Sequence, residues 1–82
     1  MSSKYQKITG RQLAAGRALA GVTQIELAGR AVISVPTLKR MEGSEGVVTG
    51  MPNNVAAVCR ALEAAGVEFT NGDQPGVRMK AK

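Results

Sequence analysis

The feature that most constrains the fold is a pair of helix-start signals that lie close together, at Thr23 and Ser34. Thr23 is a preferred N-cap residue, and Glu26 three residues later completes a capping box. Ser34 repeats the signal, and Pro36 is tolerated in the first turn of a helix, where N–H groups lack intrahelical partners. The segment up to Gly43 therefore predicts two short helices joined by a turn of about three or four residues.

Each of these two helices carries a short apolar stripe at helical spacing. Leu27, Ala28 and Ala31 form the stripe of the first helix, and Leu38 and Met41 form that of the second. The small side chain of Ala28 lets the two helices approach closely. A pair of short helices cannot bury both stripes alone, so flanking helices are expected to cover them.

Two flanking helices are predicted from the same signals. A capping box from Thr9 to Gln12 starts a helix that should run to about Ala20, and Pro52 starts another that ends at Gly66. For the first of these helices we expect one buried side, formed by Leu13, Ala14, Arg17, Ala18 and Leu19.

After Gly66 the pattern changes from helical to alternating. VEFT and GVRMK are typical of two strands, with Glu68 and Arg78 able to pair across the polar face. The turn between the strands is assigned to Asn71, Gly72, Asp73, Pro75 and Gly76. We therefore expect a loose segment over 1–8, a helical domain over 9–66 and a β-hairpin over 67–80.

Composition narrows the possible partners. The 82 residues suit one domain with a modest core, and the formal charge of +5 favours a polyanion. Only Tyr5 and Phe69 are aromatic, so the stacking platforms of single-strand and RNA-binding modules are missing, which favours duplex DNA. The alternative is a basic surface with no such partner.

Several absences guide the remaining expectations. The sequence has no His and one Cys, Cys59, which excludes a Cys/His zinc cluster and an intramolecular disulfide. It shows no nucleophile–base pair, paired carboxylates or phosphate loop, so we expect no enzyme activity, cofactor, metal or small-molecule ligand. No apolar run approaches the ~18 residues of a spanning helix, and we expect a cytoplasmic protein without membrane contact.

The segment from about Thr9 to Glu45 resembles the helix-turn-helix of the Cro/phage-repressor (XRE) family of transcriptional regulators. The matching residues are Arg17, Thr23, Gln24, Glu26, Leu27, Ala28, Ser34, Thr37, Leu38, Met41, Glu42 and Gly43. The region ALEAAGVEFTNGDQPGVRMK is similar to the tail of a short bacterial subgroup of that family. The resemblance implies a mainly α domain of four to five helices with a C-terminal β-hairpin, and operator or promoter DNA as the partner.

The resemblance also implies roles for individual residues. Gln24 would hold a DNA phosphate, although a solvated polar residue is the alternative. Arg17 would form a structural ion pair with Glu42, and the alternative is a surface arginine whose charged end reaches solvent. The residues expected to face DNA are Ser34, Val35, Pro36, Thr37, Lys39 and Arg40. Further phosphate contacts are expected at Thr49, Asn53 and Asn54, for which the ordinary polarity of a loop is the alternative.

Side-chain chemistry separates the roles within this set. Arg40 suits a guanine edge, Val35 or Thr37 a thymine methyl group, and Lys39 a phosphate. Ser34 is also the expected N-cap, so its hydroxyl is either occupied internally or free for DNA.

Two positions depart from the family pattern. Val32 stands where the turn usually has Gly, so the turn either takes another geometry or stores strain. Val35 and Pro36 replace long polar side chains, so DNA shape and phosphate contacts are expected to carry more of the binding.

The hairpin is expected to make a homodimer, because such units usually bind as two-fold dimers and an isolated hairpin is marginal in water. It would pair edge to edge or pack an apolar face formed by Val67, Phe69, Val77 and Met79 on a partner. The alternative is that it only covers its own helices.

The sequence thus predicts a transcriptional regulator, a repressor acting as a homodimer. The alternative is an antitoxin-like or other protein-interaction module on the same scaffold.

Overall fold

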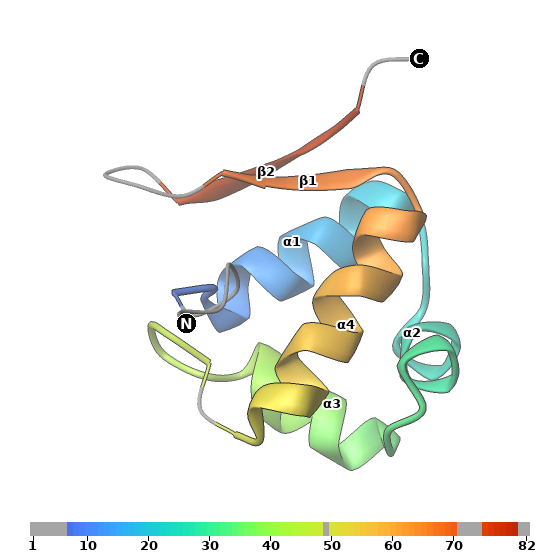
Figure 1. Ribbon diagram of the computed structural model, residues 1–82, viewed down its shortest axis with the longest axis vertical. Coiled ribbons are helices and arrows are strands. Elements are labelled where there is room, and N and C mark those ends of the chain that lie inside the picture. Colours follow the sequence, from blue (N-terminus) through green and yellow to red (C-terminus); the bar gives the residue numbers. More distant parts are fainter. Residues whose placement is uncertain (1–6, 49, 71–74, 81–82) are drawn as a thin grey trace.

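The computed structural model describes residues 7–48, 50–70 and 75–80, which form four helices and a two-stranded antiparallel hairpin (Figure 1). The elements are α1 (Gly10–Ala20), α2 (Gln24–Ala31), α3 (Val35–Glu42), α4 (Pro52–Ala64), β1 (Val67–Thr70) and β2 (Gly76–Met79). The prediction of a mainly α domain with a C-terminal hairpin is confirmed. No helix in the described ranges is long and apolar enough to cross a membrane.

The helix starts lie where the capping signals place them. Thr9 and Thr23 each form a complete capping box, with Gln12 and Glu26 as the respective partners. The hydroxyl of Ser34 accepts a hydrogen bond from Thr37 N at 3.2 Å. These local bonds satisfy N–H groups that the first helical turns leave without partners.

The core lies where the four helices and the hairpin meet. Its largest fully buried side chains are Ile8, Leu13, Leu27, Leu38, Leu62, Val58, Val67 and Cys59. Ile8 belongs to the segment that was expected to be loose, but its carbonyl accepts a hydrogen bond from Val48 N at 2.9 Å. That prediction is wrong for Ile8, while residues 1–6 lie outside the described residues.

The buried side of α1 differs from the prediction. Ala18 is exposed and 49% of Leu19 is accessible, whereas Gln12 and Gly16 are buried. The cause is the hairpin, which packs closely on α1: a Cβ atom added to Gly16 would lie 3.2 Å from Val67 Cγ1. Sequence periodicity within α1 does not reveal this contact, because the partner lies far along the chain.

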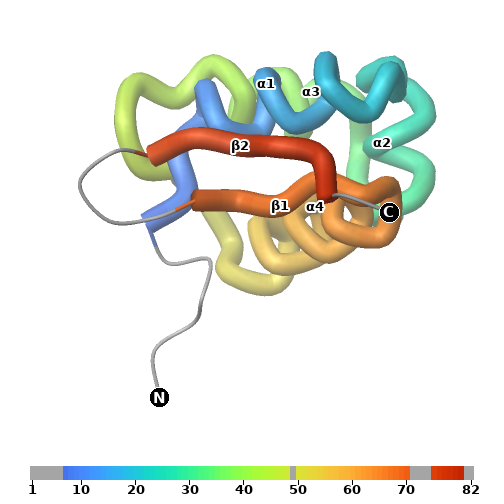
Figure 2. Tube along the Cα trace, turned by 90° about the horizontal axis from the view of Figure 1, so that it is seen from above, coloured from blue at the N-terminus to red at the C-terminus, as the bar shows by residue number. Residues whose placement is uncertain are grey.

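The hairpin pairs Val67 with Met79, Glu68 with Arg78, and Phe69 with Val77. The predicted ion pair between Glu68 and Arg78 is confirmed on the polar face. Residues 71–74 of the predicted turn lie outside the described residues. The opposite, apolar face lies on α1 and α4, so the hairpin covers its own helices (Figure 2).

Gln12 fastens the hairpin to α1. Its Nε2 donates to Thr70 O at 3.0 Å and to Gly76 O at 3.1 Å, while its Oε1 accepts from Thr9 N. Gln12 therefore acts both in a capping box and as a clamp on the end of the hairpin where β1 finishes and β2 begins. The sequence indicates only the first of these roles.

The turn between α2 and α3 contains a left-handed residue. Val32 has φ 58° and ψ 48° and is 88% exposed, so a β-branched residue adopts the left-handed conformation in this turn. The left-handed region costs a non-glycine residue about 1–2 kcal/mol, and no buried contact of the Val32 side chain offsets this cost. The two expectations for this turn were another geometry and stored strain, and the structure shows the strained left-handed conformation.

We predict that Val32→Gly raises the free energy of unfolding, by up to about 1 kcal/mol. Relief of the left-handed strain exceeds the extra entropy that glycine gives the unfolded chain. Urea denaturation would measure the change, with Val32→Ala as the control that keeps most of the strain. Equal stability of the glycine and alanine variants would show that the turn is not strained.

Candidate nucleic-acid interface

The α2–α3 pair presents one face of α3 outward. Leu38 and Met41 are buried, whereas Pro36, Lys39 and Arg40 are exposed, as the sequence predicts. Val35 and Thr37 lie at the border and are half-buried, with Val35 packed against the core. The outward face of α3 thus combines two cations with apolar and hydroxyl side chains.

The hydroxyl of Ser34 is used within the protein. Besides capping α3, Ser34 Oγ donates to Thr37 Oγ1 at 2.8 Å. Both residues lie at the start of α3, and Ser34 is exposed. Of the two alternatives for Ser34, the structure favours internal use of its hydroxyl.

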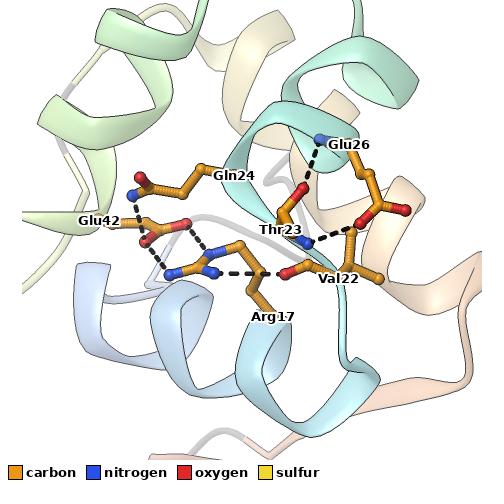
Figure 3. Close-up of polar contacts among 6 residues, drawn as sticks. All are labelled: Arg17, Val22, Thr23, Gln24, Glu26 and Glu42. Atoms are coloured by element: carbon orange, nitrogen blue, oxygen red, sulfur yellow. Dashed lines mark hydrogen bonds and ion pairs between the residues drawn. The ribbon is translucent and has the colours of Figure 1, made fainter.

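The predicted ion pair between Arg17 and Glu42 is present (Figure 3). Arg17 Nε donates to Glu42 Oε2 at 2.8 Å and Arg17 Nη2 to Glu42 Oε1 at 3.2 Å, a bidentate arrangement. Arg17 Nη1 also donates to Val22 O at 3.3 Å. Only 7% of the Glu42 side chain and 24% of the Arg17 side chain are accessible, so water screens this pair weakly.

Gln24 joins the same network. Its Nε2 donates to Glu42 Oε1 at 3.1 Å, so the carboxylate of one α3 residue receives hydrogen bonds from α1 and α2 (Figure 3). The structure therefore places the Gln24 amide as a brace between α2 and α3. Its expected contact with a DNA phosphate stays a prediction.

A second contact fixes the carboxyl end of α3 against the start of α1. A Cβ atom added to Gly10 would lie 2.7 Å from both Met41 O and Ser44 O, which is closer than atoms can approach. Gly10 N donates to Gly46 O at 3.1 Å. Only glycine permits this approach, and no local sequence pattern indicates it.

The start of α4 adjoins the exposed face of α3. Thr37 and Arg40 border a hollow of about 270 Å³, which is also lined by Met41, Gly50, Met51 and Asn54. Asn53 is exposed in the first turn of α4, and Thr49 lies outside the described residues. Met51, an exposed apolar residue beside the outward face of α3, is the member of this surface that sequence reasoning missed.

The chemistry of this surface suits recognition of a polyanion. Within the described residues, no group of three or more His, Cys, Asp or Glu side chains is arranged to hold a metal ion. Glu42, the acidic residue of α3, is turned into the ion pair with Arg17, which leaves Lys39 and Arg40 as the charges on the outward face.

Comparison with protein-family models gives no match for this chain, and comparison with curated proteins gives no significant one.

We predict that Arg17→Met lowers the free energy of unfolding by about 2–3 kcal/mol, because it leaves the sheltered Glu42 carboxylate without its charged partner. The matched control is Arg78→Met, which breaks an ion pair that is mostly exposed and should cost less than about 1 kcal/mol. Urea denaturation would measure both. Equal losses would show that the Arg17–Glu42 pair has no special structural role.

Glu26 gives a prediction for acid stability. The backbone N–H of Thr23, and then its hydroxyl, hold the pKa of the Glu26 carboxyl below its ordinary value of 4.5. A carboxyl whose pKa is lower in the folded than in the unfolded state stabilises the folded protein at pH values above its ordinary pKa. This stability is lost as the pH falls through the pKa of the folded state. We expect Glu26→Gln, which keeps an acceptor but does not titrate, to flatten the decline in the urea midpoint between about pH 5 and pH 2. An unchanged decline would contradict this assignment.

Proposed function

We propose that this protein is a sequence-specific double-stranded DNA-binding transcriptional regulator of the helix-turn-helix class. The observation that carries the proposal is the outward face of α3, which presents Lys39 and Arg40 while Leu38 and Met41 anchor the helix from behind. A helix of this kind fits the major groove, where side chains can reach base edges.

The network around Glu42 supports the same proposal. A reading helix must keep its orientation, because a small displacement breaks hydrogen bonds to base edges. Arg17 and Gln24 hold Glu42 from α1 and α2, and the close approach at Gly10 holds the same end of α3. These contacts leave the outward side of α3, which carries Lys39 and Arg40, free to meet DNA.

Individual roles follow from side-chain chemistry. Arg40 can form two hydrogen bonds with a guanine edge, and Lys39 supplies a point charge for a phosphate. Thr37 or Val35, both half-buried at the border of this face, would make the apolar contact with a thymine methyl group. Gln24 and Asn53 are the proposed phosphate contacts beside the reading helix, where they would set its register on the duplex.

The proposed action is repression, in which the bound protein blocks a promoter. A domain of this size leaves little surface for recruiting a polymerase once its α3 face is on DNA. The net charge of +5 supports binding to duplex DNA and predicts strong salt dependence.

We predict distinct effects for the two cations of α3. Selection from a random duplex pool would supply a binding site, and affinities would then be measured at several salt concentrations. Arg40→Ala should cost about 1–3 kcal/mol of binding and relax specificity at one base-pair position. Lys39→Ala should weaken all sequences alike and reduce the salt slope by about 1.

The matched control is Arg60→Ala, which removes one exposed cation from α4, away from α3. It should leave base preference unchanged. Identical effects of Arg40→Ala and Lys39→Ala would refute the assigned roles. If the protein shows no salt-dependent duplex binding and instead forms a stable complex with another protein, the protein-interaction alternative holds.

A further inference from the structure

The outer side of α2 carries three residues that are unfavourable for an isolated domain. Ile25 is apolar and 74% exposed, and Val32, at the end of the helix, is apolar, 88% exposed and left-handed. Gly29 lies inside the helix, where glycine is less favourable than alanine. The three positions have the i, i+4, i+7 spacing of one helix side, and they form an exposed apolar row.

Packing within the chain does not explain Gly29. A Cβ atom added there would have no neighbour within 4 Å apart from adjoining residues and the backbone of its own helix. A Cβ atom added to Gly10 or Gly16 would instead lie 2.7 or 3.2 Å from a packed neighbour. Those two glycines permit close contacts inside the domain. Within the described residues Gly29 permits none, and it leaves the backbone of α2 open to approach from outside.

Two opposite charges lie beside this apolar row. Glu26 and Arg30 are both exposed, and they are one helical turn apart on the adjoining side of α2. Glu26 Oε1 accepts a hydrogen bond from Thr23 N at 3.1 Å. A carboxylate accepts several hydrogen bonds, so Glu26 can cap the helix and still receive a donor from another molecule. The outer side of α2 therefore has an apolar row and, alongside it, a row with one acid and one base.

We infer that this surface, formed by Ile25, Glu26, Gly29, Arg30 and Val32, binds the same surface of a second copy. A two-fold axis that crosses the helices near Gly29 brings the two α2 helices together antiparallel. The apolar rows then face each other, with Ile25 against Val32 of the partner subunit and the two glycines opposed. The charged rows also face each other, with Glu26 against Arg30 of the partner subunit.

The pattern of charges selects a second copy in this orientation. The pairs Ile25 with Val32, Gly29 with Gly29 and Glu26 with Arg30 have their midpoints between positions 28 and 29, so one axis satisfies all of them. A parallel two-fold arrangement would instead lay the apolar row of each copy on the charged row of the other. The surface is complementary to itself in both rows, which favours a second copy over an unrelated helix.

The position of α2 leaves room for this contact. Figure 1 shows α2 on one flank of the domain and α3 along its lower border. A copy docked on α2 would therefore lie beside the domain and not over the border that α3 forms. The contact needs no DNA, so the inference goes beyond the proposed function. If that function holds, the contact would join copies bound at neighbouring sites on one duplex.

The contact surface is small, so we expect a dissociation constant on the order of 0.1–1 mM. Sedimentation equilibrium of the full chain at low salt, without DNA, would measure self-association up to about 1 mM. A chain that stays monomeric over that range would overturn the inference, whatever the DNA measurements show. Any self-association through another surface is the same in the α2 variants, so comparison with these variants isolates the α2 contact.

Gly29→Gln separates binding from folding. Glutamine is the better helix former, so this variant should raise the midpoint of urea unfolding. It should also weaken self-association by at least about tenfold, because its side chain occupies the point where the two helices meet. Arg60→Gln is the matched control, since it places the same side chain on the exposed side of α4 and should leave self-association unchanged. Undiminished self-association of Gly29→Gln would overturn the inference.

Exchanged charges test the pairing of Glu26 with Arg30. Arg30→Glu alone opposes acid to acid across the axis, and Glu26→Lys alone opposes base to base. Each variant should therefore associate with itself at least about tenfold more weakly than the unsubstituted chain. An equimolar mixture of the two restores both opposite-charge contacts and should regain most of the lost affinity. A mixture that associates no more strongly than the separate variants would refute this pairing.

Glu26→Lys also removes the acceptor that caps Thr23 N, so circular dichroism must show that this variant keeps its helices. Where it does not fold, Glu26→Gln takes its place, because glutamine keeps a capping acceptor. Its mixture with Arg30→Glu retains one opposite-charge contact and should associate more strongly than either variant alone. The same strength in all three samples would count against a second copy as the occupant.

Discussion

The carboxylate of Glu42 is the point on which the arrangement of the first three helices depends. It receives a bidentate pair of hydrogen bonds from Arg17 of α1 and a third bond from Gln24 of α2. The charge is largely removed from water, so its loss of hydration must be offset by these donors. One acidic residue at the end of α3 thereby couples the orientation of α3 to two other helices.

Backbone packing adds a second constraint at the same end of α3. The close approach of Gly10 to the carbonyls of Met41 and Ser44 allows no side chain between α1 and α3. On the outward side of the same helix, Pro36, Lys39 and Arg40 are exposed. A helix that is held at its carboxyl end and has one side exposed suits the proposed role of a reading element, since it can meet a ligand without rearranging the core.

The hairpin and α1 also depend on each other. The absence of a side chain at Gly16 lets Val67 and Val77 pack on α1, and the amide of Gln12 ties the far end of the hairpin to the same helix. A two-stranded sheet is marginal by itself and is stabilised by packing on a helix. The packing turns α1 so that Ala18 and Leu19 remain exposed.

The sequence by itself determined the helix starts, the alternating hairpin strands and the outward face of α3, because N-caps, turn residues and side-chain periodicity act over a few neighbouring residues. The resemblance added the ion pair between Arg17 and Glu42. Only the tertiary structure decided which side of α1 is buried, the clamp at Gln12 and the contact at Gly10. These features depend on residues far apart in the chain, and their distances are set by packing rather than by local conformation.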